Sequence, residues 1–320
     1  MTVTVPITKP TGAATSRMTL DSIHKAATGP IRLLLCGQEG IGKTTFAADA
    51  PNPIFLGSED GFGLLTPDTF PEPKSLPDVM DALRTLETTT HSYQTLVIDT
   101  VDWLEPLVWA QVCAEGQKAS IKDFGYGDGF TAALEKWRLF LNGLERVRRA
   151  KQMHIVLLAH TKIHHFANPE GEDYDHYRLA LNDKAAGLMR QWVDAVLFAQ
   201  FRVIVDKKKD QRGKAIGTPE RVVHTVKRAV FDAKNRYELP ETLPLSWEAF
   251  AKFAFNPRTT AQLVAEITEL CGRAPGEVGP QTLAFMKTIE KDRKRLVEVA
   301  NRLRTIVENH EATKATEQQS

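Results

Sequence analysis

The 320-residue chain lacks several features that would place it in a familiar class. It has only three cysteines, Cys36, Cys113 and Cys271, which stand far apart and without CxxC or His partners at the spacing of a metal site. We therefore expect reduced structural residues in a cytosolic chain. No apolar run approaches the roughly 20 residues that span a bilayer, and the N-terminus has no basic region followed by an apolar core. These absences predict a cytoplasmic protein without a membrane partner.

The sequence also lacks a net charge of either sign. Its 41 Lys and Arg residues are balanced by 40 Asp and Glu residues, so overall charge does not mark a nucleic-acid binder and any basic surface must be local. No internal repeat recurs along the chain. With 42% hydrophobic and 25% charged residues, the composition is typical of a globular protein with one large domain, or with one domain and an appendage.

Short apolar runs alternate with helical patterns from residue 31 onward. The runs at 31–36, 53–56, 95–99 and 154–159 predict strands. The helices are predicted from residue 43 and over 76–87, 131–150 and 183–194. This alternation is typical of an α/β fold in which a mostly parallel central sheet is flanked by helices on both faces.

The second half of the chain departs from this alternation. Apolar runs at 201–205 and 221–230 bracket a polar loop and predict an antiparallel hairpin at the sheet edge, followed by an irregular, proline-spaced wrap over 239–255. A short helix at 259–272 and a long amphipathic helix, with an apolar face from 289 to 307, predict an extension that either packs on the core or binds a partner. The predicted units are a flexible arm (1–29), a core (30–256), a helical extension (257–309) and a disordered tail (310–320).

The stretch GQEGIGKT at 37–44 fits the phosphate-binding motif GxxxxGK[ST]. Its glycines let backbone N–H groups turn inward around phosphates, and the helix that follows points its positive end at them. Lys43 would then reach the β- and γ-phosphates of ATP, and Thr44 would hold Mg²⁺. The residues expected to bind the nucleotide are Gly37, Gln38, Glu39, Gly40, Ile41, Gly42, Lys43, Thr44 and Thr45.

A second acidic group is needed to hold the metal and its water shell. Asp99 supplies one at the end of TLVID, which has the pattern of a fully buried strand, although an Asp that only caps the following turn would look the same. We expect Asp99 to act on Mg²⁺ through water. The next residue is Thr100, whereas ATPases of the AAA+ type place there a Glu that polarises the attacking water. The hydrolytic base must therefore come from elsewhere.

With PIFLGSEDG and HIVLLAHTK in this order, the chain resembles the RecA-like ATPases. In that family the catalytic Glu lies at the end of the strand after the P-loop helix, which implies Glu59 as general base, with an ordinary surface acid as the alternative. RecA-like proteins also end a later strand with a polar residue that senses the γ-phosphate and connects it to a DNA-binding loop. The resemblance implies His160 in that role, unless it merely ends the strand.

The same resemblance implies two segments that contact single-stranded DNA, 161–183 and 115–130. Rings and cations in them would permit sequence-tolerant stacking and backbone contact. In the first segment, Glu170, Glu172, Asp173 and Asp175 depart from a phosphate-tracking groove. A plain surface loop explains the second segment almost as well. The candidate DNA-binding residues are Lys118, Lys122, Phe124, Tyr126, Lys162, His164, His165 and Arg178.

FDAKNRYELP, at 231–240, resembles the element by which RecA-core ring ATPases insert fingers into a neighbouring subunit's nucleotide site. It implies Lys234 and Arg236 as trans fingers that stabilise charge on the transferred phosphoryl group, with a basic surface turn as the alternative. Glu238 stands where that family has Gly. The basic hairpin tip at 207–214 is more typical of a solvated turn than of a phosphate contact.

Taken together, these motifs are similar to those of the phage-encoded RecA-core ATPases, often described as phage nucleotide-binding or AAA-type proteins, some of which are single-strand annealing recombinases. The resemblance implies an ATPase that assembles head to tail as a ring or filament and binds single-stranded DNA. It would promote annealing or strand exchange in phage recombination, in the host cytoplasm and beside a single-strand DNA-binding protein. A helicase or helicase-loading motor, and a nucleotide-gated assembly adaptor with slow hydrolysis, remain alternatives.

Overall fold

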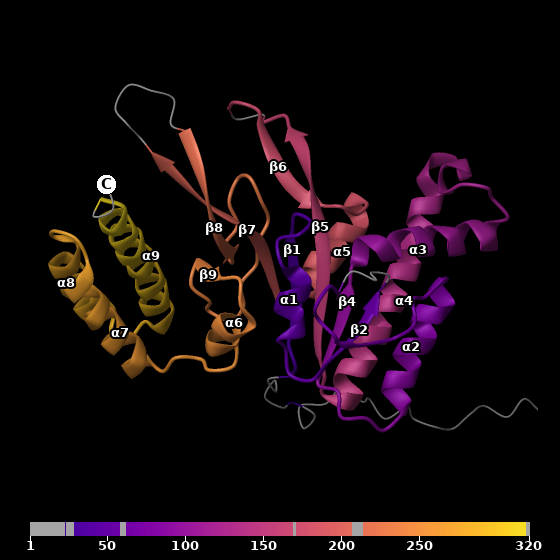
Figure 1. Ribbon diagram of the computed structural model, residues 1–320, viewed down its shortest axis with the longest axis horizontal. Coiled ribbons are helices and arrows are strands. Elements are labelled where there is room, and N and C mark those ends of the chain that lie inside the picture. The colour runs from indigo at the N-terminus through magenta and orange to yellow at the C-terminus, as the bar shows by residue number, and fades with distance from the viewer. Residues whose placement is uncertain (1–22, 24–28, 58–61, 169–170, 207–213, 318–320) are drawn as a thin grey trace, which may run out of the picture.

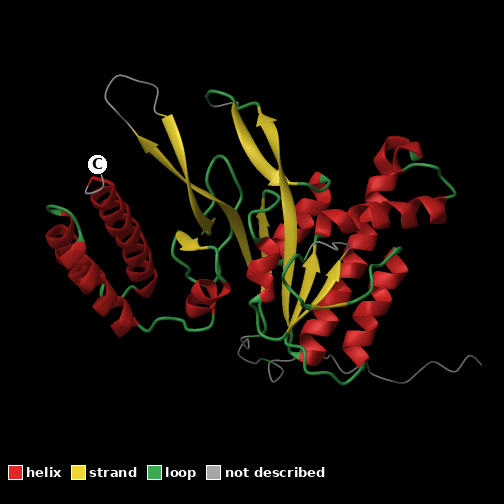
Figure 2. Cartoon of the chain, in the orientation of Figure 1, coloured by secondary structure: helices red, strands yellow, loops and turns green. Residues whose placement is uncertain are grey.

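The computed structural model describes residue 23 and residues 29–57, 62–168, 171–206 and 214–317. Its centre is a nine-stranded sheet with the order β3-β2-β4-β5-β1-β7-β8-β9, and β6 pairs with β5 outside this path (Figures 1 and 2). The strands are β1 (Arg32–Gly37), β2 (Pro53–Gly57), β3 (Asp68–Thr69), β4 (Thr95–Asp99), β5 (His154–Phe166), β6 (Tyr174–Leu179), β7 (Ala195–Asp206), β8 (Lys214–His224) and β9 (Thr242–Pro244). The helices are α1 (Lys43–Ala48), α2 (Leu76–Thr88), α3 (Val101–Gly116), α4 (Asp128–Lys151), α5 (Asp183–Trp192), α6 (Trp247–Ala254), α7 (Thr260–Arg273), α8 (Val278–Ile289) and α9 (Arg293–Glu317).

The apolar runs form strands because both faces of the sheet are covered. Alternate residues of a strand point to opposite faces, so Leu34 and Cys36 of β1 pack with helices α2–α5, whereas Leu33 and Leu35 pack with α1 and α6. The strands from β3 through β7 along the sheet are parallel to their neighbours. The predicted class, a mostly parallel sheet flanked by helices, is confirmed.

The predicted edge hairpin is β7–β8, which is antiparallel, and β9 pairs with β8 at its outer side. Residues 239–255, which were expected to form an irregular wrap, contain regular secondary structure. It forms β9 and then α6, whose N-cap Ser246 accepts a hydrogen bond from the backbone of Ala249. Trp247 and Phe250 of this helix are buried against Phe46 of α1, so the segment closes one face of the core.

One helix, α3, was absent from the expected elements. It begins two residues after Asp99 and runs to Gly116, with Pro106 inside it. The sequence did not predict this helix because its apolar residues lie on most sides and it contains a proline. No apolar face with the 3.6-residue period of a helix is therefore visible in the sequence. The buried side chains of α3 join the hydrophobic core on the face of the sheet that α2 and α4 cover, and this helix packs mainly against α4.

The C-terminal extension has three helices where two were expected, and they form a hydrophobic cluster of their own. The expected long helix is interrupted after Ile289, and α9 begins again at Arg293. Five residues were predicted to form the apolar face over 289–307, and all five are buried. Ile289 ends α8, and the others lie on α9: Leu296, Ala300, Leu303 and Val307. The tail predicted to be disordered from residue 310 is helical through Glu317, which corrects that boundary. The arm predicted over 1–29 lies almost entirely outside the described residues.

The extension joins the core beside the Lys-Asn-Arg turn, at the end of the sheet away from α2 and α4 (Figure 1). Asn301 of α9 donates to the carbonyl of Leu239 at 3.1 Å, and Arg293 donates to the carboxylate of Glu238 at 2.8 Å. Among the helices that the structure describes, none combines the length and the apolar character needed to cross a membrane.

Candidate nucleotide site

The loop between β1 and α1 turns inward at two glycines. Gly40 has φ +69° and Gly42 has φ +104°, a region that side-chain-bearing residues rarely adopt. Gly42 also leaves room for a neighbour, because a Cβ there would lie 2.9 Å from Nη1 of Arg221. The loop borders a cavity of about 510 Å³ lined by Gly40, Gly42, Lys43, Thr44, Thr45, Phe62, Leu64, Leu65, Asp99, His160 and Arg221. Five of the nine predicted nucleotide residues therefore line one cavity.

Lys43 lies inside this loop with 5% of its surface exposed. Its Nζ donates to the carbonyl of Gln38 at 3.0 Å and to that of Gly37 at 3.4 Å. The two carbonyls hold the ammonium at the inner rim of the loop, beside Thr44. A phosphate that entered the cavity would meet a positive charge already in place, and charge-assisted hydrogen bonds are the stronger kind.

Thr44 and Asp99 form the predicted metal position. Thr44 Oγ1 donates to Asp99 Oδ2 at 2.8 Å, and Asp99, at the end of β4, is 2% exposed. Gly57 of β2 approaches Asp99 so closely that a Cβ on Gly57 would lie 1.8 Å from the Asp99 carbonyl oxygen. A hydroxyl and a carboxylate are the hard oxygen donors that Mg²⁺ takes beside water and phosphate oxygens. The donor chemistry of the pair therefore fits this ion.

His160 reaches the same cavity from β5, where it lies opposite Gly37 of β1. Asp102 of α3 holds it twice: its carboxylate accepts from the His160 backbone N–H at 2.8 Å and lies 2.8 Å from Nδ1. Since a carboxylate only accepts, Nδ1 carries the hydrogen and the ring orientation is fixed. Burial raises the pKa of Asp102, but the hydrogen bonds from His160 outweigh burial and hold that pKa below its ordinary value.

Arg221 is a charged residue of the cavity that the sequence did not indicate. It lies on β8 opposite Phe201, and its guanidinium carbon is 6.0 Å from the centre of the Phe201 ring, within the range of a cation–π contact. Its backbone carbonyl accepts from Leu245 at 3.0 Å, which fixes this part of the strand. A lone Arg in a predicted edge strand is usually solvated surface, so only the packing of β8 against the P-loop reveals its position.

Glu59, the predicted general base, lies outside the described residues. Of the described residues on either side of it, Gly57 pairs with Asp99 in the sheet and Phe62 lines the cavity. The assignment of Glu59 therefore stays a prediction that rests on the resemblance.

Lys234 does not extend outward as a trans finger. Its ammonium donates to the carbonyls of Arg190, Gln191 and Val193 at 3.0, 3.3 and 2.5 Å. These carbonyls lie at the end of α5, where the last carbonyls of a helix have no N–H donors within the helix, so Lys234 supplies donors and caps this helix. Burial, and secondly the nearby Arg236, lower the pKa of Lys234. The predicted finger role of Lys234 is corrected to a capping role within its own chain.

Arg236 lies at the opposite end of the sheet from the P-loop. Its Nη1 is 3.3 Å from Asp194 Oδ1, and its side chain is 57% exposed. Asp194 also pairs with Arg32, at 2.7 Å, and Arg32 is the first residue of β1. The P-loop follows the last residue of the same strand, Gly37. At 3.3 Å per residue, the two ends of β1 are roughly 17 Å apart. Arg236 therefore cannot serve its own cavity, and only a neighbouring chain's site stays open to it.

The first predicted DNA segment is a hairpin and not an irregular loop. β5 continues past His160 to Phe166 and pairs with β6 in antiparallel register, so the hairpin projects beyond the sheet (Figure 1). A ring nitrogen of His165 lies 3.3 Å from a carboxylate oxygen of Asp173 and the other lies 3.4 Å from one of Asp175, so the ring contacts two acidic residues of the same hairpin. The predicted residues Lys162, His164 and His165 are exposed on it, and Arg178 is half-buried.

The second predicted DNA segment consists of two short 3₁₀ turns, Ile121–Asp123 and Gly125–Gly127, between α3 and α4. Lys118, Lys122 and Tyr126 are exposed there. Phe124 is half-buried, and its ring packs into space left by two glycines: a Cβ on Gly116 would lie 2.5 Å from it and one on Gly129 2.8 Å. The ring therefore has a packing role, and its DNA role stays a prediction.

Comparison with known proteins places these features in a family. The model of a family described as "AAA domain" matches residues 29–237, which include every described residue of the cavity. No curated protein matches the sequence. Among solved structures, the crystal structure of the RadB recombinase aligns over 69% of this chain and 90% of its own, with 13% identity and a TM-score of 0.36.

Proposed function

The chain belongs to the AAA-domain family of P-loop ATPases, and from that premise we propose that it hydrolyses ATP in the P-loop cavity and couples hydrolysis to single-stranded DNA. The observation that carries the proposal is the continuity of β5. The strand that brings His160 to the nucleotide cavity runs unbroken into the projecting hairpin β5–β6. A change at the γ-phosphate would therefore have a direct mechanical route to the proposed DNA surface.

In the proposed reaction, water attacks the γ-phosphorus and the bond to the β,γ-bridging oxygen breaks. Lys43 and Arg221 are fixed positive charges that would stabilise the negative charge of the phosphate oxygens in the transition state. Thr44 and Asp99 would hold Mg²⁺, which when bound draws negative charge from the β- and γ-phosphates. Glu59 would take the proton of the attacking water, as the resemblance implies. His160, oriented by Asp102, would hydrogen-bond the γ-phosphate or its water.

The DNA part of the proposal rests on exposed groups in both predicted segments. Lys162, His164 and His165 lie on the hairpin, and Lys118 and Lys122 lie beyond α3. Contacts of this kind, cations beside rings, bind single strands with little sequence preference. We further propose head-to-tail assembly as a ring or filament, with Arg236 reaching a neighbour's cavity, and a role in annealing or strand exchange during phage recombination in the host cytoplasm. A single-strand DNA-binding protein is the proposed partner.

The test is ATP hydrolysis by the purified chain with and without single-stranded DNA, run beside Glu59→Gln and Arg138→Gln. Arg138 is an exposed residue of α4 whose side chain is 52% accessible, so it serves as the control. We expect DNA to stimulate hydrolysis in the wild type and the control, and Glu59→Gln to abolish turnover while retaining nucleotide binding. Hydrolysis that ignores DNA would contradict the coupling. Directional unwinding of a duplex would instead identify a helicase.

A nucleotide-gated adaptor is the second candidate, and the position of the C-terminal helices favours it. Helices α7–α9 form a separate hydrophobic cluster and bind the core at Glu238 and Leu239, directly after the Lys-Asn-Arg turn. An adaptor predicts assembly that depends on bound ATP and on these helices, with little turnover. Removing the residues after Pro257 would then abolish assembly and leave nucleotide binding intact, whereas a DNA-stimulated ATPase would assemble through its core.

A further inference from the structure

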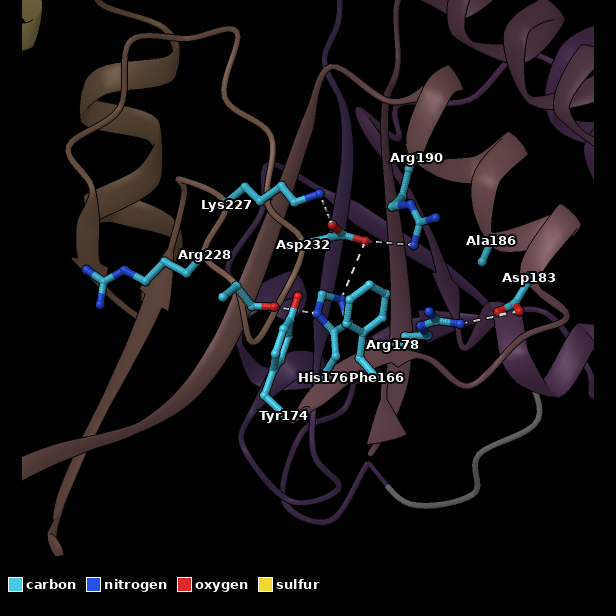
Figure 3. Close-up of a pocket in the computed structure, with 11 residues that line it drawn as sticks. Phe166, Tyr174, His176, Arg178, Asp183, Ala186, Arg190, Lys227, Arg228 and Asp232 are labelled. Atoms are coloured by element: carbon cyan, nitrogen blue, oxygen red, sulfur yellow. Dashed lines mark hydrogen bonds and ion pairs between the residues drawn. The ribbon is translucent and has the colours of Figure 1, made fainter. Parts of the chain in front are cut away.

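A second cavity, separate from the P-loop, lies between the hairpin β5–β6, helix α5 and the segment that follows β8 (Figure 3). We call it the hairpin pocket. Its volume is about 410 Å³, and its charged lining consists of Arg178, Arg190, Lys227, Arg228, Asp183 and Asp232. Four cations thus face two carboxylates in a chain whose overall charge is close to balance. Of these residues only Arg178 stood out in the sequence, because the others come from α5 and from the segment after β8.

The wall of the pocket formed by residues after β8 is fixed against the hairpin. His176 is 9% exposed, and its Nδ1 lies 2.6 Å from the carbonyl oxygen of Ala229, to which it must donate. One residue along, the backbone N–H of Tyr177 donates to the carbonyl of Val230 at 2.8 Å. The pocket is therefore built from hydrogen-bonded backbone, and its charges are held in place before a ligand arrives.

Asp232 positions the cations of this wall and of α5. Arg190 Nη1 lies 3.0 Å from one of its carboxylate oxygens and Lys227 Nζ lies 3.1 Å from the other, and Figure 3 shows the two side chains converging on it from opposite sides. A guanidinium has five N–H donors and an ammonium has three, so one carboxylate leaves donors on both. Such pre-ordered donors suit a phosphate group, which accepts several hydrogen bonds at once.

Aromatic rings stand at the same pocket. Phe166 and Tyr174 face each other across the last paired position of the hairpin, with ring centres 5.0 Å apart and planes inclined by 40°. Both line the pocket and both are half-buried. A ring beside a cluster of cations is the combination that binds a base and its phosphate in single strands.

We propose that the hairpin pocket holds one nucleotide unit of a single-stranded nucleic acid, with the phosphodiester at Arg190, Lys227 and Arg178 and the base against Phe166 or Tyr174. The inference rests on the proposed DNA binding and extends it from the first predicted segment, which holds Arg178, to Arg190 and Lys227, which lie outside both predicted segments. A continuing strand fits better than a free nucleotide because the pocket adjoins the exposed cations of the hairpin, over which the chain would run.

The test is equilibrium binding of a fluorescently labelled oligodeoxythymidine, measured over a range of NaCl concentrations. The variant Arg190→Gln/Lys227→Gln is compared with Arg138→Gln/Lys74→Gln, which removes the same charge and two exposed ion pairs elsewhere. We expect the pocket variant to bind on the order of tenfold more weakly. Its salt dependence should be shallower by roughly 0.7 in log–log slope for each phosphate that the variant no longer neutralises. The control should bind like the wild type. Circular dichroism melts of both variants report whether they fold.

Asp232→Asn supplies the opposite change. It frees donors on Arg190 and Lys227 and adds one positive charge, so we expect tighter oligonucleotide binding even if the variant is less stable. If the ion pairs of Asp232 only stabilise the fold, the Asp232→Asn variant will be less stable and will bind the oligonucleotide no more tightly. That result would overturn the proposal.

The remaining outcomes separate the pocket from the proposed function. Equal binding by the pocket variant and its control would overturn the pocket and leave DNA binding intact elsewhere on the chain. No binding by the wild type would overturn both. Unlabelled thymidine monophosphate can also be tested as a competitor of the labelled oligonucleotide. If it competes as well as an unlabelled oligonucleotide at the same nucleotide concentration, the pocket is a mononucleotide site, and the assignment to a strand would be overturned.

Discussion

Gly42 and Arg221 lie so close that a side chain on the first would collide with the second: a Cβ at Gly42 would be 2.9 Å from Arg221 Nη1. Gly42 is required for its backbone as well, because its φ is +104°. The P-loop and β8 are therefore matched to each other, and the match brings an arginine of the same chain to the nucleotide cavity. The structure thus offers an arginine in cis, where the sequence had suggested an arginine only as a finger in trans.

Arg221→Ala should slow ATP hydrolysis roughly a hundredfold to a thousandfold, the range found when one fixed stabilising donor is removed from a transition state. Arg221→Lys should be intermediate, since an ammonium keeps the charge but loses the planar fork. The measurement is kcat at saturating ATP, with Arg138→Ala as the control. Turnover like that of the control would show that Arg221 does not act on the nucleotide.

Mixing experiments distinguish a residue that acts in cis from one that acts in trans. Lys43→Ala and Arg221→Ala chains each carry one defect in the same cavity, so no mixture of them contains a cavity with both residues. We expect no recovery of ATPase activity at any ratio. Recovery would mean that Arg221 reaches a neighbour's nucleotide, contrary to its position beside Gly42.

Arg236 should behave in the opposite way if the chain assembles head to tail. Lys43→Ala and Arg236→Ala lie at opposite ends of the sheet, so a mixed interface would restore an intact cavity faced by an intact finger. We expect partial recovery, greatest at intermediate ratios. If the mixtures assemble, as shown by light scattering, but recover no ATPase activity, Arg236 does not act at a neighbour's nucleotide site.

Glu238 allows a stability test of the junction between core and extension. It has φ +57°, in the left-handed region, and its carboxylate binds Arg293 of α9 with both partners partly exposed. Glu238→Ala and Glu238→Gly both lose this ion pair, but only Ala keeps a Cβ where it is strained. The Gly variant should be more stable than the Ala variant by roughly 1 kcal/mol in urea unfolding. Equal stabilities would show that the strained backbone relaxes in the variants.

His224 predicts a pH dependence of stability. Burial, and secondly the charges of Arg228 and Arg202, lower the pKa of His224 from its ordinary value of 6.5 to about 4. Between these values the unfolded chain binds a proton that the folded chain does not, so stability falls as the pH falls through this window. The loss from about pH 7 to about pH 5 should be roughly 2 kcal/mol in urea unfolding.

The matched control for this pH effect is His224→Gln, which cannot titrate and still offers a partner to Gln200, whose Nε2 lies 2.7 Å from His224 Nε2. Its stability should depend less on pH in the same window. An equal pH dependence in the variant and the wild type would assign the effect to other groups, of which His154, whose pKa is also lowered by burial, is the first to test.

The order of the elements was predictable because short-range patterns determine it. Runs such as TLVID can form only buried strands, and the spacing in GQEGIGKT is that of a loop whose backbone encloses phosphates. The sequence therefore determined the α/β class, the phosphate loop and the pairing of Thr44 with Asp99. It could not determine the projecting hairpin, because the polar alternation of 161–179 has no apolar face, and its order depends on pairing between β5 and β6.

The roles that the sequence assigned by analogy were the ones that tertiary contacts decided. Lys234 stands in a finger motif, yet its ammonium is occupied by the carbonyls at the end of α5, a helix more than 40 residues earlier in the chain. Arg221 belongs to no motif and nevertheless lies at the nucleotide cavity. The relative positions of residues that a motif holds at fixed spacing can be predicted from the sequence alone. The direction of a side chain brought in by another strand depends on how the sheet packs, and only the folded structure shows it.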